Sequence, residues 1–230
     1  MPFNLSGYFR EPIIRFFAYL IFVRIIVSSI SWYAEYHIVE YHEKPAQAKL
    51  ENQGNRDALA EILNRQILQC DSQFRQLLVT KNLKHIENIL KKNQDTMGKA
   101  QLVLQVLADG GEYTNTQLVN FYDMDQVSDV IVFSKDNSAD ISVNVLNLSP
   151  RLPELSKHIS DIAKYLKEEV ASQNKLTNSP YELGLLTKQT ESLLLRTQED
   201  VNKIHYDIKM ENIEFQAEID KSEASLRSIR

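Results

Sequence analysis

Residues 179–226 read SPYELGLLTKQTESLLLRTQEDVNKIHYDIKMENIEFQAEIDKSEASL. Pro180, with Ser179 before it and Glu182 after it, forms the pattern of a capping box with proline at the first helical position. Beyond Gly184 the stretch contains no glycine or proline. Apolar residues recur there at the helical spacing of three and four, namely Leu183, Leu186, Leu193, Val201, Ile204, Ile208, Phe215, Ile219 and Leu226. The stretch predicts one amphipathic helix of roughly 50 residues, about 75 Å long.

Polar residues interrupt this apolar stripe at Thr190, Thr197 and Ser222. An interrupted stripe suits an antiparallel hairpin with residues 152–173, or a bundle of several chains, better than a long parallel dimer. An alternative is two helices, broken near Lys209, that pack within one globule. We expect the stripe to bind partner proteins, in a homo- or hetero-oligomer, through Leu186, Leu193, Val201, Ile204, Ile208, Phe215 and Ile219.

A second apolar stretch lies near the N-terminus, where residues 16–34 read FFAYLIFVRIIVSSISWYA. Its length matches the thickness of a bilayer, and Trp32, Tyr33 and Tyr36 fall where an aromatic belt would lie. The stretch predicts a helix that anchors the protein to a membrane. We expect the contacts with lipid or with a partner to come from Phe16, Phe17, Leu20, Ile21, Phe22, Val23, Ile25, Ile26, Val27 and Trp32.

Arg24 is the single charge between residues 16 and 34, and it makes insertion marginal. An arginine near the centre of a span costs about 2.5–3.5 kcal/mol on insertion scales. A helix buried in its own fold or against a partner is therefore the second interpretation, and an interfacial or signal-like helix is the third. Ser29 and Ser31 resemble a cleavage site, but Arg24 interrupts the apolar region that a signal peptide needs. Basic residues flank both ends of the stretch, so the charges leave its orientation open.

Between these two stretches, residues 46–108 show helical patterns. Residues 53–55, Gln-Gly-Asn, predict a loop, after which apolar residues recur at helical spacing from Leu59 to Leu78. A break is expected near Thr80, the pattern continues over residues 83–90, and a further short helix over residues 102–107 should stop at the glycine pair 110–111. The region predicts a helical hairpin or a bundle segment.

Residues 109–150 have a different character. Residues 130–133, Val-Ile-Val-Phe, and the alternation over residues 141–148 predict a β-hairpin with its turn at residues 135–138. With a second helix expected at residues 115–126, the order of elements resembles that of a winged-helix unit. Residues 109–148 contain seven acids and one lysine, which leaves a local charge of about −6. The segment is therefore expected to bind protein and to repel DNA.

The sequence as a whole predicts a mainly α-helical protein with four parts. These are an N-terminal hydrophobic anchor helix and its flank (1–45), amphipathic helices (46–108), a small α+β-hairpin unit (109–150) and a two-helix, coiled-coil-like region (151–230). The chain is 43% hydrophobic and 25% charged, which is typical of a folded protein, and its net charge of −5 disfavours nucleic acid as a partner. The single cysteine, Cys70, lies in an apolar helical pattern and suits a buried position in a reducing compartment, so the bulk of the chain is expected in the cytoplasm.

No pattern in the chain predicts chemistry. The glycine patterns of nucleotide-binding and nucleophile loops do not occur, and His37 and His42 have neither the spacing nor the partners of a metal site. We therefore expect no catalytic residues, metal, cofactor or small-molecule substrate. The sequence predicts a non-catalytic interaction or scaffolding subunit of a membrane-associated assembly. The alternative is a soluble adaptor or chaperone-like protein whose N-terminal helix is buried in its own fold or in a partner's groove.

Overall fold

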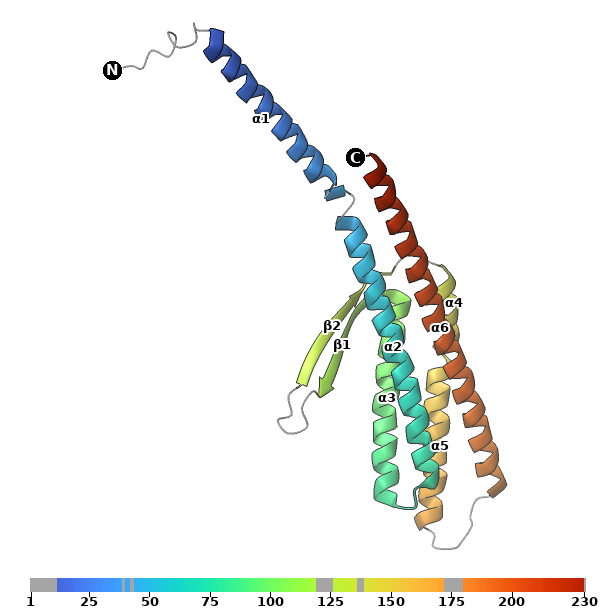
Figure 1. Ribbon diagram of the computed structural model, residues 1–230. Helices are drawn as coiled ribbons and strands as arrows, with labels where there is room; N and C mark the ends of the chain where they lie inside the picture. The colour runs from blue at the N-terminus through green and yellow to red at the C-terminus, as the bar shows by residue number, and fades with distance from the viewer. Residues whose placement is uncertain are drawn as a thin grey trace. The chain divides into compact units, whose positions relative to one another are not determined.

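A computed structural model describes residues 12–38, 40–41, 44–118, 126–135, 139–171 and 180–229 (Figure 1). The protein is mainly α-helical with a two-stranded antiparallel sheet, which confirms the predicted fold class. It forms two compact units, Met1–Glu51 and Asn52–Arg230. The elements are α1 (Pro12–Ile38), α2 (Lys44–Val79), α3 (Leu83–Asp109), β1 (Gly111–Leu118), β2 (Gln126–Phe133), α4 (Ala139–Leu148), α5 (Arg151–Ala171) and α6 (Pro180–Ile229).

The helix α2 runs without interruption through Gly54, so the loop predicted at residues 53–55 was wrong. A glycine inside a helix costs only about 1 kcal/mol relative to alanine. The apolar face that follows, from Leu59 to Leu77, is fully buried and stabilises the helix by more than that cost. Residues 102–107 are likewise part of the continuous helix α3 and not a separate helix.

The break predicted near Thr80 is confirmed, because α2 ends at Val79 and α3 begins at Leu83. Asn82 is the N-cap of α3. Its backbone is extended, and its side-chain oxygen accepts hydrogen bonds from the amides of Lys84 (3.0 Å) and His85 (3.3 Å). This cap satisfies two of the free amides at the start of α3 and turns the chain back against α2.

Gly110 ends α3 and begins the connection to the sheet. Its φ of 77° lies in the region that favours glycine, and its amide donates to the carbonyl of Val106 (2.8 Å). A Cβ atom at this position would lie 3.1 Å from both the Phe133 carbonyl oxygen and the Lys135 amide nitrogen. Glycine is therefore required both for the turn and for the close approach of the end of β2.

The β-hairpin is present, but its strands lie earlier in the sequence than predicted. β1 and β2 pair in antiparallel register from Gly111 with Phe133 to Leu118 with Gln126. The helix expected at residues 115–126 is strand at both of its described ends, and the strand expected at residues 141–148 belongs to α4. Both predictions were wrong. The order of elements is α3, β1, β2 and α4, which differs from the helix, helix and hairpin of a winged-helix unit.

Each misplaced segment has a physical explanation. Residues 111–118 owe their extended structure to Tyr113 and two threonines, which favour strands although they give no apolar run. Residues 141–148 alternate in polarity, but they also place Val145 and Leu148 three positions apart on one helical face. The core buries both of these residues, and short apolar segments are the ones whose period is ambiguous.

The second unit has one continuous hydrophobic core, to which α2, α3, α4, α5, α6 and the hairpin all contribute. α3 contacts α5, and α6 contacts both α4 and α5, which follow one another along it (Figure 1). The predicted contact between residues 152–173 and the C-terminal helix is thus present. The side chains that close the core at the sheet are Tyr113, Ile131 and Phe133.

Polar side chains inside the bundle are matched across its helices. Asn93 of α3 donates to the Gln73 side-chain oxygen of α2 (3.2 Å), and Gln73 donates to the Thr96 hydroxyl (3.1 Å). All three residues are buried. Because an unmatched amide in this position would cost about 1–3 kcal/mol, the chain of hydrogen bonds favours one register between α2 and α3.

The sheet is fastened to α2 by two asparagines. The Asn52 side-chain amide donates to the Ser134 carbonyl oxygen (2.8 Å), and the Ser134 amide donates back to the Asn52 side-chain oxygen (2.8 Å). One turn later, Asn55 donates to the Val132 carbonyl oxygen (3.0 Å). These contacts satisfy backbone groups at the edge of β2 that has no partner strand.

Replacing Asn52 with alanine should lower the free energy of unfolding by about 1–2 kcal/mol, because two hydrogen bonds to the backbone are lost. Asn64→Ala is the matched control, since Asn64 is also inside α2 and makes no side-chain hydrogen bond within the described residues. Both changes improve helix propensity equally. Urea unfolding of the full-length protein in mild detergent gives the difference, and equal stability of the two variants would show that the contact contributes nothing.

Candidate functional site

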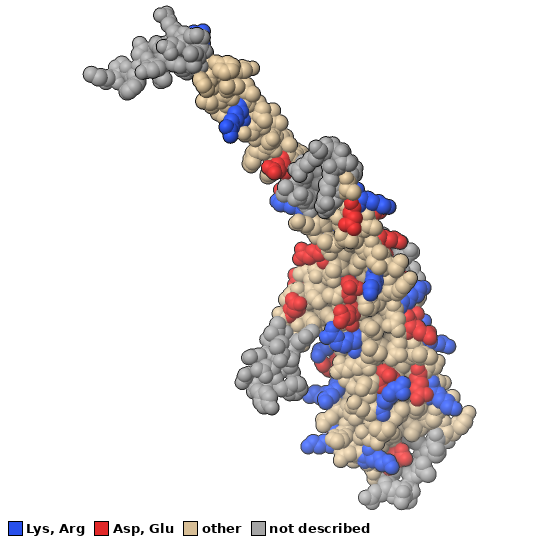
Figure 2. Space-filling view, in the orientation of Figure 1, with Lys and Arg blue, Asp and Glu red and all other residues tan. Residues whose placement is uncertain are grey.

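The apolar helix α1 exposes the residues that the sequence predicted to contact lipid or a partner. Nine of the ten are exposed and Val23 is half-buried. The segment Arg15–His37 is long and apolar enough to span a membrane, and no residue in it is buried. At 1.5 Å per residue its length is about 34 Å, against roughly 30 Å for the hydrocarbon core of a bilayer. In Figure 2, α1 is almost uniformly uncharged, whereas charges of both signs are interspersed over the second unit.

Aromatic rings gather at the C-terminal end of α1. Trp32 stacks on Tyr36 with the ring centroids 5.9 Å apart, and Tyr33 meets the ring of His37 at 5.1 Å. His37 in turn stacks on Tyr41 at 4.4 Å. Such amphipathic rings are favoured where hydrocarbon gives way to headgroups and water. The sequence placed an aromatic belt here, and the structure shows that its rings contact one another.

The apolar stripe of α6 was predicted to bind partner proteins. Part of it belongs instead to the core of this chain. Val201, Ile204 and Ile208 are at most 1% exposed and belong to the core of this chain. Leu186 and Leu193 are half-buried and pack against that core. Val201, Ile204 and Ile208 are therefore enclosed by this chain, whereas Leu186 and Leu193 remain partly exposed. Phe215 and Ile219, beyond the last buried residue of α6, are also half-buried.

The polar residues in this stripe do not weaken it. Thr190 and Thr197 are fully buried, and their hydroxyls donate to the carbonyl oxygens of Leu186 and Leu193, each at 2.7 Å. A threonine that hydrogen-bonds within its own helix can be buried without an unmatched polar group. The two threonines interrupt the apolar stripe in the sequence, but they are compatible with a position in the core. α6 is one continuous helix through Lys209, so the alternative of two broken helices was wrong.

A second apolar stripe, not predicted from the sequence, lies on the opposite side of α6. Its members are separated by nearly whole numbers of helical turns, about half a turn away from Val201. Their exposed fractions range from 38% for Met210 to 76% for Tyr181. We call this surface the outer stripe of α6, and it comprises Tyr181, Leu185, Leu195, Tyr206, Met210 and Ile213. The signal that could have found it is the second, offset series of large apolar residues in the same helix.

Polar contacts between α6 and its neighbours fix which face of α6 turns inward. Arg151 of α5 pairs with Asp200, and Asn144 of α4 donates to Asp207 (3.2 Å). On α2, the nearly buried Arg56 pairs with Glu211. Leaving a buried guanidinium without its carboxylate would cost several kcal/mol. The pair therefore fixes the orientation of α6 near Glu211, just beyond its last buried residue.

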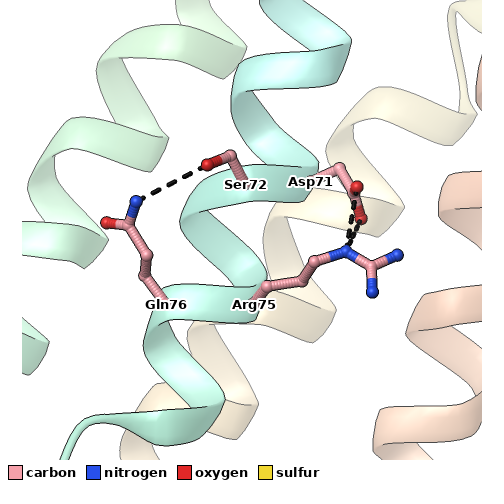
Figure 3. Close-up of polar contacts among 4 residues, drawn as sticks. All are labelled: Asp71, Ser72, Arg75 and Gln76. Carbon is pink, nitrogen blue, oxygen red and sulfur yellow. Dashed lines mark hydrogen bonds and ion pairs between the residues drawn. The ribbon is translucent and has the colours of Figure 1, made fainter.

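Elsewhere, charged side chains of α2 form a solvated surface. Asp71 accepts two contacts from Arg75, at 3.2 and 3.1 Å, and Gln76 donates to Ser72 at 3.5 Å (Figure 3). All of these pairs are four residues apart on one helix, where they stabilise it by a few tenths of a kcal/mol. Within the described residues, no group of three or more histidine, cysteine, aspartate or glutamate side chains is arranged to hold a metal ion.

Cys70 is fully buried between α2 and α3, as predicted. Its sulfur accepts a hydrogen bond from the Asn93 side-chain amide at 3.2 Å. Burial disfavours the thiolate and raises the pKa of Cys70 to about 11, although the bond from Asn93 opposes that shift. The thiol is thus a core residue and not a reactive nucleophile.

Native protein should react with iodoacetamide at pH 8.5 far more slowly than unfolded protein. A thiol with a pKa near 11 is almost entirely protonated at this pH, and its rate should rise as pH approaches 11. Mass spectrometry after timed quenching gives the rates, with protein in urea as the control. Equal rates in the native and unfolded states would contradict the buried position of Cys70.

Comparison with protein-family models, curated proteins and solved structures found no match to this chain.

Proposed function

We propose that the chain is a membrane-anchored, non-catalytic subunit that recruits other proteins through helix packing. The observation that carries the proposal is the segment Arg15–His37, which is long enough to span a bilayer and has no buried residue. A helix that is apolar on all sides is stable either in lipid or enclosed by protein. Because the segment exposes large apolar side chains along its whole length, lipid is the environment that best accounts for it.

The second unit supports the recruiting role. It buries a continuous core and still exposes the outer stripe of α6, whose large apolar side chains share that face with the polar residues Lys188, Ser192 and Glu199. Exposed apolar surface of this kind is typical of sites that bind other proteins, and helix packing against such a stripe is a common mode of recognition. The single cysteine is buried and free, which agrees with a position of this unit in the reducing cytoplasm.

The hairpin adds to the argument against nucleic acid as the partner. Asp109, Glu112 and Asp129 are exposed on or beside the strands, and Lys135 is the one basic residue between residues 109 and 148. Phosphate groups would be repelled from this surface, because binding to nucleic acid depends on neutralising them with cations. A protein partner is therefore the better match for the hairpin as well.

Insertion of α1 can be measured with Trp32, which is the single tryptophan of the chain. In phosphatidylcholine vesicles its emission should shift to the blue and be quenched by brominated lipid, more strongly when bromine is near the headgroups than at the chain ends. The protein should also stay in the membrane pellet after carbonate extraction. The control is Ile26→Asp, which adds a second central charge and should weaken insertion.

A full-length protein that is released by carbonate, with Trp32 emission unchanged by vesicles, would contradict the anchoring role. That result would favour the alternative of a soluble adaptor whose N-terminal helix is covered by a partner.

The two faces of α6 should respond differently to the same substitution. Val201→Asp puts a carboxylate into the core and should lower the free energy of unfolding by several kcal/mol, whereas Leu195→Asp should change it by less than about 0.5 kcal/mol. The Leu195 variant should stay folded by circular dichroism and lose the proteins that co-purify with the wild type from native membranes. If it keeps those proteins, the outer stripe is not the recruiting surface.

A further inference from the structure

Arg24 lies in the middle of the membrane-type segment without a counter-charge. It is nine residues after Arg15 and 13 before His37, the two ends of the segment. Residues 20, 21, 27 and 28, which lie beside it on the helix, are Leu, Ile, Val and Ser. The next acid of α1 is Glu35, about 16 Å further along the axis, and the described residues contain no ion pair to Arg24.

A shallow groove lies directly beside Arg24 on the surface of α1. It is lined by Ile21, Arg24, Ile25, Ser28, Ser29 and Trp32. The side chains of its two serines are much smaller than those of the isoleucines and the tryptophan that also line it. Small residues allow a second helix to approach closely in a membrane, and their hydroxyls can hydrogen-bond across the contact.

Arg24 and Ser28 belong to a polar line on one face of this helix. Ser31 continues the line, since residues 24, 28 and 31 are separated by four and seven positions and lie on nearly the same side. The opposite side, between residues 16 and 34, exposes the large side chains of Tyr19, Phe22, Ile26 and Tyr33. α1 thus has one face suited to hydrocarbon and one face that combines a cation with small hydroxyl residues.

We propose that Arg24 and the serine groove are the docking face for a second membrane-spanning helix that carries an aspartate or glutamate near its midpoint. The proposal rests on the membrane-spanning role of α1 proposed above. Ionisable side chains inside membranes pair with one another or face the interior of a helix assembly. A carboxylate at the depth of Arg24 would neutralise the charge, and the groove would bring the two backbones close enough for the pair to form.

The charge also excludes a second copy of this chain in parallel orientation as the occupant. Such a copy would bring one Arg24 against the other, and like charges at short range repel. The partner that fits is therefore a different helix with an acidic residue. Arg24 makes insertion of an isolated α1 marginal. Pairing with the carboxylate of the partner would remove that cost, so α1 should insert more favourably together with the partner.

The test uses the full chain in phosphatidylcholine vesicles with a leucine-rich, single-span peptide that has one glutamate at its midpoint and a dansyl acceptor. A midpoint residue lies at the same depth in either orientation of the peptide. Energy transfer from Trp32 to dansyl measures association, and matched peptides with Gln or Leu at the midpoint are the controls. The Glu peptide should associate about fivefold to thirtyfold more tightly than the Leu peptide.

Two variants of the chain separate the charge from the groove. Arg24→Leu should abolish the preference for the Glu peptide and retain insertion. The double variant Arg24→Val with Val23→Arg has the same composition but moves the charge to the side of the helix away from the groove, five and six positions from Ser28 and Ser29, and it should also lose the preference. Quenching of Trp32 by brominated lipid is measured for each variant, so that insertion is known independently of association.

Several results would overturn the proposal. If wild type inserts but binds the Glu and Leu peptides equally, Arg24 is compensated in another way, such as by a lipid phosphate, while the membrane anchor stands. If the Gln peptide binds as tightly as the Glu peptide, the site does not select a carboxylate. If the double variant binds as well as wild type, the groove is not the docking face. If Trp32 does not insert in the wild type, the anchor and this inference both fail.

Discussion

The second unit depends on the burial of one face of α6. Val201, Ile204 and Ile208 are enclosed in a core to which α2, α3, α4, α5 and the hairpin all contribute. Burying a side chain of this size contributes about 1.5–3 kcal/mol, so the three together stabilise the fold by more than any ion pair on its surface. Each neighbouring helix is long enough to cover only part of α6. α4 and α5 therefore lie in sequence along the same helix.

Polar contacts decide how this core is arranged. Apolar packing alone tolerates a shift of one helix along another, because leucine and isoleucine can exchange places at little cost. Asn93 and Gln73 cannot shift without losing their hydrogen bonds, and Arg56 cannot leave Glu211 without remaining charged and nearly buried. The asparagine contacts between α2 and the end of β2 do the same for the sheet. These groups restrict the unit to one register while the apolar residues supply most of its stability.

The two units suit different solvents. The second unit has the pattern of a domain that is surrounded by water, with a buried apolar core and charges of both signs on its surface (Figure 2). α1 has large apolar side chains on every side and a single charge between residues 16 and 34. That charge is costly in lipid, and the chain offers it no carboxylate within reach on its own helix. If α1 spans a membrane as proposed, Arg24 is the residue that calls for a counter-charge there, and Ser28 lies one turn further along the same face.

Long and strongly periodic segments could be predicted from the sequence alone. The start of α6 at Pro180, its length of 50 residues, the end of α2 near Thr80, the end of α3 at Gly110 and the apolar character of α1 all follow from local patterns. Capping, proline and glycine act over one or two turns, so their effects do not depend on the rest of the chain. Cys70 was placed correctly for the same reason, since it lies within a clear apolar stripe.

Tertiary structure alone decided which partner each face meets. Val201 and Leu195 are both apolar residues of one helix, and no local pattern states that the first is buried while the second is exposed. Residues 141–148, predicted as a strand of the hairpin, are a second example. Their period fits a strand or a helix equally well, and contact of α4 with α6 selects the helix. Whether a residue is buried depends on the segments that pack against it, and these are distant in the sequence. The sequence therefore determined where the helices begin, end and present apolar residues, and the packing of the chain determined which of those surfaces became core and which stayed exposed.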